Sequence, residues 1–166
     1  MRIDRRGFLQ HSVIAGGIGW LVARPSAAGA EKHAFEVTHT EAEWRKLLSP
    51  DQFAVLRQAA TERPFTSPLL NEHRTGTFVC AGCQLGLFAS ATKFDSGTGW
   101  PSFWQPIAKA VDESRDGSLG MDRTAVECHR CGGHLGHVFD DGPKPTGLRY
   151  CINGVALTFQ PKAGAK

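Results

Sequence analysis

The sequence predicts a mainly β fold of antiparallel strands, with short helices at its N-terminal side. From Gly76 onward, short apolar or β-branched runs alternate with glycine-rich turns, a texture typical of antiparallel strands. Before Gly76, two serine or threonine residues each precede a glutamate or glutamine by three positions, which marks the start of a helix. With 166 residues, the chain is expected to hold a single domain.

The individual elements follow from these signals in chain order. Residues 31–39 show no clear period and are expected to lead into a domain that spans residues 40–160. Thr40 predicts a short helix that ends near Leu48, and Ser49, followed by proline, predicts a second helix that ends near Thr61. The runs that predict strands are 77–80, 85–89, 102–104, 125–128 and 150–159. Residues 161–166 are expected to form a flexible tail.

Residues 1–30 predict an export signal. A basic start is followed by a short apolar, glycine-rich stretch at 12–23 and by small residues at Ala28 and Ala30. The pair Arg5-Arg6 before Phe-Leu is typical of the twin-arginine class, so we expect cleavage after Ala30 and a bacterial periplasmic or extracellular location. The alternative is an anchor helix that stays attached, but the apolar stretch is short for a membrane span.

The charge of the chain argues against a nucleic-acid partner. The 19 basic and 16 acidic side chains give a net charge of +3. Residues 1–30 contain four of the basic and one of the acidic side chains, so the rest of the chain holds 15 of each and is neutral. Binding of phosphates requires a basic surface. No apolar run reaches the ~18 residues of a membrane span, so we expect no membrane contact after the signal is removed.

Four of the five cysteines form two Cys-x-x-Cys pairs, Cys80 with Cys83 and Cys128 with Cys131. The spacing lets both sulfurs of a pair face one ion, and two such knuckles complete a tetrahedron of thiolates with no position left for water. The sequence therefore predicts one structural zinc ion (Zn²⁺) that staples the domain. Two alternatives stay open: disulfides, which an oxidising compartment favours, and redox pairs, which usually occur in a βαβ pattern that is absent here.

The fifth cysteine, Cys151, is the candidate nucleophile. Cysteine in a strand is often a small buried hydrophobe. However, Arg149 can favour the thiolate, and the period of two places Asn153 on the same strand face as both. His134 and His137 follow the second knuckle and precede two aspartates, which predicts an acid–base cluster, although each could be a structural or surface histidine.

A glycine-rich loop precedes Trp100. The indole in such a loop predicts an aromatic wall for a small apolar group of the substrate. The alternative is a core tryptophan beneath a turn.

These motifs together resemble the methionine-R-sulfoxide reductases of the B type. The resemblance runs from about Thr40 to Phe159. It implies two antiparallel sheets with short N-terminal helices and a structural zinc, and reduction of the R-epimer of methionine sulfoxide in oxidised proteins or peptides. The motifs that carry it are Gly-Thr-Gly-Trp100-Pro-Ser-Phe, the two Cys-x-x-Cys pairs, Gly-Gly-His134-Leu-Gly-His137-Val-Phe and Arg149-Tyr-Cys151-Ile-Asn153.

The resemblance also implies a role for each site residue. Cys151 matches the nucleophile, and Trp100 matches the residue that receives the terminal methyl of the substrate. The chemistry then has Cys151 attack sulfur while an acid, His137 by preference, protonates oxygen, which leaves a sulfenic acid on Cys151. The implied groups around the sulfoxide are His134, His137 and Asn153, the implied supports of the acid and the thiolate are Asp141 and Arg149, and Phe139 is a second substrate-binding candidate.

One position departs from the pattern. Many members of that family carry a cysteine where this chain has Thr98, and that cysteine resolves the sulfenic acid as a disulfide. If zinc holds the other four cysteines, no thiol remains for this step, so we expect an external thioredoxin-like or glutaredoxin-like reductant. We also expect a monomer.

Two other functions compete with this interpretation. A non-catalytic four-cysteine zinc-ribbon binding module with an inert Cys151 would explain the knuckles but not Trp100 or the histidines. An exported disulfide oxidoreductase would need a redox-active Cys-x-x-Cys pair.

Overall fold

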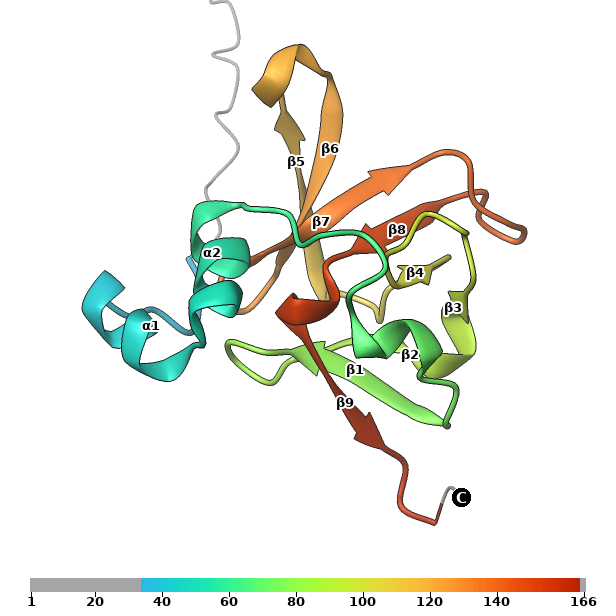
Figure 1. Ribbon diagram of the computed structural model, residues 1–166, viewed down its shortest axis with the longest axis horizontal. Coiled ribbons are helices and arrows are strands. Elements are labelled where there is room, and N and C mark those ends of the chain that lie inside the picture. The colour runs from blue at the N-terminus through green and yellow to red at the C-terminus, as the bar shows by residue number, and fades with distance from the viewer. Residues whose placement is uncertain (1–33, 165–166) are drawn as a thin grey trace, which may run out of the picture. The chain divides into compact units, whose positions relative to one another are not determined.

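A computed structural model describes residues 34–164, and within them nine strands form two antiparallel sheets (Figure 1). The three-stranded sheet has the order β2-β1-β9, and the six-stranded sheet has the order β3-β4-β8-β7-β6-β5. The predicted mainly β fold with two antiparallel sheets is therefore confirmed. The strands are β1 (Gly76–Cys80), β2 (Gly86–Ala89), β3 (Lys93–Phe94), β4 (Ser102–Phe103), β5 (Val111–Asp116), β6 (Arg123–Cys128), β7 (His134–Phe139), β8 (Arg149–Ile152) and β9 (Leu157–Pro161).

The two sheets pack through buried aromatic side chains. Phe78 of β1 and Phe88 of β2 both contact Phe103 of β4, with ring centroids 5.0 and 4.4 Å apart. All three rings are fully buried. Burial of each ring contributes on the order of 2–3 kcal/mol, which makes this cluster a large part of the core.

Both predicted helices are present and begin at the predicted caps. Thr40 caps α1 (Glu41–Leu47) and Ser49 caps α2 (Pro50–Gln58), each with a complete capping box. The second helix ends earlier than expected, because Ala59 takes the left-handed conformation with φ of 54°. Four apolar side chains of these helices are buried, namely Trp44, Phe53, Val55 and Leu56.

The strand predicted at 150–159 is wrong as a single element. It breaks after Ile152 into β8 and β9, which belong to different sheets, and a 3-10 turn, η4 (Gly154–Ala156), joins them. Asn153 therefore lies at the start of a turn instead of on the strand face of Cys151. The chain crosses from one sheet to the other here, directly after the candidate nucleophile.

Three strands were not predicted. The two-residue β3 is too short to show a period. The outer edge strand β5 reads VDESRD and buries none of its side chains, so it lacks alternating apolar residues. The strand β7 contains the histidine motif and a glycine, which interrupt the alternation of apolar and polar residues that predicts a strand.

Hydrogen bonds attach both ends of the described chain to the domain. Residues 34–40 form no helix or strand, and Val37 donates its amide hydrogen to the carbonyl of Arg130. At the other end β9 reaches Pro161, and Lys162 donates to Thr75. The predicted signal at residues 1–30 lies outside the described residues. No helix within residues 34–164 is long and apolar enough to cross a membrane.

Candidate functional site

Cys151 lies in the middle of the six-stranded sheet. It is paired with Ser102 of β4 on one side and with His137 of β7 on the other (Figure 1). Directly opposed residues on antiparallel strands share a face of the sheet, so these three side chains point the same way. The neighbours Tyr150 and Ile152 are buried in the core, so Cys151 points away from it.

A cavity of about 130 Å³ lies over this face. It is smaller than the ~300–1,000 Å³ of a typical ligand pocket, so it suits one side chain of a substrate. Five of the residues singled out in the sequence line it, namely Trp100, His137, Phe139, Cys151 and Asn153. The other lining residues are Thr61, Arg123 and Gly136. Three other predicted residues do not line it, namely His134, Asp141 and Arg149.

Burial raises the pKa of the Cys151 thiol above its usual value. Contact with the Thr98 hydroxyl, 3.8 Å from the sulfur, and the charge of Arg149 lower the same pKa, but burial outweighs them. Arg149 thus favours the thiolate as expected, without making it the resting state. Cys151 is therefore a protonated thiol at neutral pH.

The charge of Arg149 is largely engaged elsewhere. Its guanidinium binds the Asp141 carboxylate through two hydrogen bonds of 2.8 Å and lies 4.4 Å from the centre of the Phe139 ring. A bidentate pair of this kind fixes both side chains. Asp141 therefore orients Arg149, and Arg149 supports the aromatic wall of the cavity.

The partner of His137 is a residue that the sequence did not reveal. One ring nitrogen of His137 lies 2.7 Å from a carboxylate oxygen of Asp116, at the end of β5. Hydrogen bonds from Ser118, and then His137, hold the pKa of Asp116 well below its usual range, so the carboxylate is ionised. The resemblance implied Asp141 as a support of the acid, but Asp141 binds Arg149 instead.

The buried ring of His134 packs against the ring of His137. Their ring centroids are 5.3 Å apart in an edge-on arrangement, and His134 is buried. Burial, and then the proximity of His137, lowers the pKa of His134 to about 4. His134 is therefore neutral at physiological pH and cannot serve there as a cationic acid.

Glu62 is the second residue that the sequence did not reveal. Its carboxylate accepts the amide hydrogens of Gly154 and Val155 at 2.6 and 3.0 Å, at the start of η4. Its own amide hydrogen is donated to the side chain of Asn153, and its carbonyl accepts the indole hydrogen of Trp100 at 3.2 Å. One loop residue thus fixes two walls of the cavity.

Thr98 starts a short chain of hydroxyl groups above the thiol. Its oxygen lies 2.8 Å from that of Ser96, which lies 2.7 Å from that of Ser102. These contacts hold the glycine loop over Cys151. The hydroxyl of Thr98 occupies the place from which a cysteine side chain would reach the nucleophile.

The four remaining cysteines come together at one point between the sheets. Their sulfur atoms all lie within 4.8 Å of one another, and two pairs across the knuckles, Cys80 with Cys131 and Cys83 with Cys128, are separated by 3.8 and 3.5 Å. A tetrahedral ion with bonds of about 2.3 Å to sulfur places its ligands about 3.8 Å apart, so the four residues fit a metal ion. All five cysteines, each within the described residues, are free thiols, which disfavours the disulfide alternative.

The two knuckles share one backbone geometry. In each, the first cysteine donates its amide hydrogen to the carbonyl five residues on and accepts one from the amide four residues on. That fourth residue is left-handed in both, with φ of 61° at Gln84 and 64° at Gly132. The backbone therefore turns each pair of sulfurs toward the same point. Arg57 of α2 braces the second knuckle by donating to the carbonyl of Cys131 at 3.0 Å.

Purified protein is expected to contain one tightly bound metal ion per chain, measured by elemental analysis. Cys128→Ser removes one ligand, so it should lose the metal and lower the midpoint of thermal unfolding by more than about 10 °C, because structural sites contribute several kcal/mol to folding. Cys151→Ser is the matched control, since its side chain lies outside the cluster, and it should retain the metal. Full metal content and stability in Cys128→Ser would contradict a four-cysteine site.

Comparison with known proteins assigns the family. The model described as the SelR domain matches residues 48–161, more than half of the chain. The peptide methionine sulfoxide reductase MsrB of Bradyrhizobium diazoefficiens is 61% identical over 128 residues, which cover 76% of this chain and 92% of the relative. The MsrB proteins of Pseudomonas putida and Leptospira interrogans are 56% and 54% identical, over 78% and 76% of this chain and 98% and 97% of theirs. The chain therefore belongs to the MsrB family of peptide methionine sulfoxide reductases.

Proposed function

We propose that this protein reduces the R-epimer of methionine sulfoxide in oxidised proteins and peptides, with Cys151 as the nucleophile. The observation that carries the proposal is the shared cavity, in which a thiol, an imidazole, an amide and an indole converge from distant parts of the chain. The indole of Trp100 and the ring of Phe139 supply the apolar surface for a methyl group. His137 and Asn153 supply the polar groups for the sulfoxide oxygen.

In the proposed reaction, the sulfur of Cys151 attacks the sulfoxide sulfur while the oxygen is protonated. Asp116 engages one nitrogen of His137, so the other nitrogen is left to give the proton and later recover it. The bond between oxygen and the methionine sulfur breaks, and this oxygen, as water, then attacks the Cys151 sulfur, which breaks the bond between the two sulfurs and releases methionine. Methionine sulfur gains two electrons, Cys151 loses two, and the thiol proton ends on the sulfenic acid.

An external thiol completes the cycle in this proposal. One reductant thiol attacks the sulfenic acid and releases water, and a second thiol displaces the resulting mixed disulfide, which restores Cys151. Thr98 supports this route, because its hydroxyl, 3.8 Å from the Cys151 sulfur, cannot form a disulfide. A thioredoxin-like or glutaredoxin-like protein is the proposed reductant. We also propose a monomer.

Zinc is the proposed occupant of the four-cysteine cluster. Cys80 and Cys83 would hold it from the three-stranded sheet, and Cys128 and Cys131 from the six-stranded sheet. Four thiolate ligands leave no open position, so the ion would stabilise the fold without acting on the substrate.

Export by the twin-arginine route is also proposed. Its support is the pattern of residues 1–30, with Arg5-Arg6 and a small-residue cleavage site that ends at Ala30. This route exports folded proteins, so zinc would be loaded in the cytoplasm and repair would take place in the periplasm or outside the cell.

The purified protein is expected to reduce the R-epimer and to leave the S-epimer unchanged, with dithiothreitol as reductant and the separated epimers as substrates. Cys151→Ser should lower kcat/KM by more than about 10³-fold, because it removes the nucleophile, while zinc content and thermal stability stay within error. Reduction of the R-epimer by this variant at more than about 1% of the wild-type rate would refute the role of Cys151.

Thr98→Cys is expected to convert the enzyme to an intramolecular disulfide cycle. A disulfide bond is about 2.0 Å long, so the new sulfur needs to move by less than about 2 Å toward Cys151. After one equivalent of substrate without reductant, mass spectrometry should find this disulfide in the variant. The wild type should instead form an adduct with a sulfenic-acid probe such as dimedone.

Thr98→Ser is the matched control for that experiment and should behave as the wild type. An intramolecular disulfide that contains Cys151 in zinc-loaded wild-type protein would contradict direct reduction by an external thiol.

Replacement of Arg5 and Arg6 by lysine is expected to keep the precursor in the cytoplasm, because the export machinery recognises the arginine pair. Cell fractionation with N-terminal sequencing measures the outcome, and wild-type protein in the exported fraction should begin at Glu31, within one or two residues. Arg2→Lys is the control and should be exported. Export of the double variant at the wild-type level would rule out this route.

A further inference from the structure

We infer that Phe65 and the cavity beside it form a binding site for the polypeptide that flanks the oxidised methionine of a substrate. The inference rests on the proposed function, and it adds a second contact region to the small cavity over Cys151. Three features of the structure carry it. They are the conformation and exposure of Phe65, its contact with the glycine loop that carries Trp100, and the cavity that Phe65 and Trp100 both line.

Phe65 occupies a conformation and an environment that are both unfavourable for phenylalanine. Its φ is 64°, in the left-handed region that bulky residues rarely adopt, and 70% of its surface is exposed to solvent. A hydrogen bond of 2.7 Å from its amide to the carbonyl of Gly99 holds the backbone there. Strained backbone and exposed apolar side chains are both concentrated at sites that bind other molecules.

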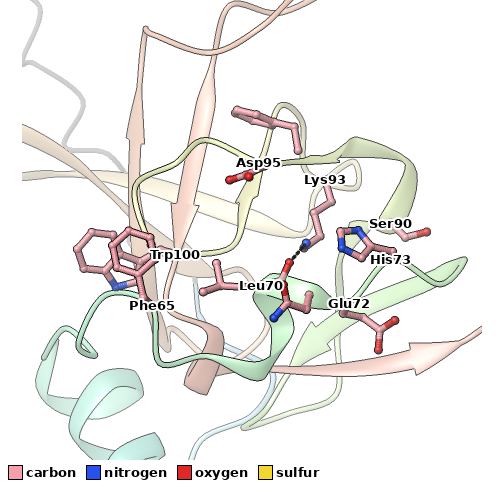
Figure 2. A pocket seen from close by; sticks show the side chains of 11 residues that line it. Phe65, Leu70, Glu72, His73, Ser90, Lys93, Asp95 and Trp100 are labelled. Carbon is pink, nitrogen blue, oxygen red and sulfur yellow. Dashed lines mark hydrogen bonds between the residues drawn. The ribbon is translucent and has the colours of Figure 1, made fainter.

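The ring of Phe65 packs on the loop that carries Trp100. A Cβ atom on Gly99 would lie 2.9 Å from two ring atoms of Phe65, so only glycine allows this close contact. The conformation of Phe65 therefore brings an aromatic ring directly beside the residue that forms the wall of the substrate cavity. In Figure 2 the rings of Phe65 and Trp100 lie at the same end of the cavity beside Phe65.

The cavity beside Phe65 has a volume of about 570 Å³, within the ~300–1,000 Å³ of typical ligand pockets. Trp100 lines this cavity and also the smaller one over Cys151. A side chain that reached Cys151 past Trp100 would leave the rest of its polypeptide over this region. Figure 2 shows the lining. The lining residues that carry the argument are Phe65, Leu70, Glu72, Lys93, Asp95 and Trp100.

The polar groups of the cavity suit an uncharged main chain better than a strongly charged partner. The ammonium group of Lys93 donates to the carbonyl of Leu70 at 2.8 Å (Figure 2), and the carboxylate of Glu72 binds Arg74. The carboxylate of Asp95, which also lines the cavity, offsets the charge of Lys93, and Arg74 offsets that of Glu72. An extended peptide has neutral amide groups and at least one side chain that could cover Phe65, which matches this lining.

Phe65→Asn tests the inference. Asparagine tolerates the left-handed conformation, so the backbone can stay in place while the ring is removed. The measurement is kcat/KM for methionine-R-sulfoxide within a short peptide, divided by kcat/KM for N-acetylmethionine-R-sulfoxide. We expect this ratio to fall about tenfold, as for the loss of a half-buried aromatic contact. An unchanged ratio, including an equal loss on both substrates, would overturn the inference.

Leu47→Asn is the matched control. Leu47 is also an exposed apolar residue, at 60%, but it lies on α1 and lines neither cavity. The ratio of the two kcat/KM values for this variant should therefore match that of the wild type. A fall in both variants would also count against a local role of Phe65.

A measurement on wild-type protein decides the question independently of any variant. The same peptide with unoxidised methionine should inhibit competitively at a concentration at least about tenfold lower than N-acetylmethionine does. Equal inhibition by both would contradict a site for the flanking chain. Absence of reduction of either sulfoxide by the wild type would instead refute the proposed function.

Discussion

The passage of the chain from the six-stranded sheet to the three-stranded sheet depends on the carboxylate of Glu62. Within η4 the backbone turns too tightly for a strand, and the amide hydrogens of Gly154 and Val155 have no partner in either sheet. Glu62 accepts both, at 2.6 and 3.0 Å. A carboxylate that accepts two amide hydrogens is a strong, directional restraint. Cys151 precedes this turn, and Asn153 begins it, so the position of the proposed nucleophile relative to the Asn153 amide follows from one loop side chain.

The cysteine cluster restrains the same two sheets at another junction. Cys80 ends β1 and Cys128 ends β6, so an ion on the four sulfurs would couple one hairpin of each sheet. The hairpin β6–β7 continues from the second knuckle into His134 and His137. The orientation of His137, the proposed acid, is thus set by the knuckle at one end and by Asp116 at the other. A site held at both ends suits chemistry that requires fixed distances between the groups that transfer a proton and an oxygen.

Local signals in the sequence predicted the helices, the knuckles and five residues of the cavity. Each of these signals lies within a few residues of its effect: Thr40 and Ser49 cap the helix that follows them, and two residues separate the cysteines of a pair. Asp116 and Glu62 could not be found in this way. They act on His137 and on Gly154, 21 and 92 residues away, and a single carboxylate in a solvent-facing strand or loop has no pattern of its own. The break at Asn153 was missed because the apolar residues on both sides of η4 look like one continuous strand.

The hydroxyl of Thr98 gives the proposed cycle a particular dependence on its surroundings. A protein with a second thiol at that place stores each oxidising equivalent in an internal bond, which protects the sulfur until a reductant arrives. Here the oxidised sulfur would wait unprotected beside an alcohol, 3.8 Å away. During that wait a second oxidant could carry it to the sulfinic acid, which thiols do not reverse. The lifetime of the enzyme would then depend on two competing rates, that at which a thiol reduces the sulfenic acid and that at which the oxidant converts it to the sulfinic acid.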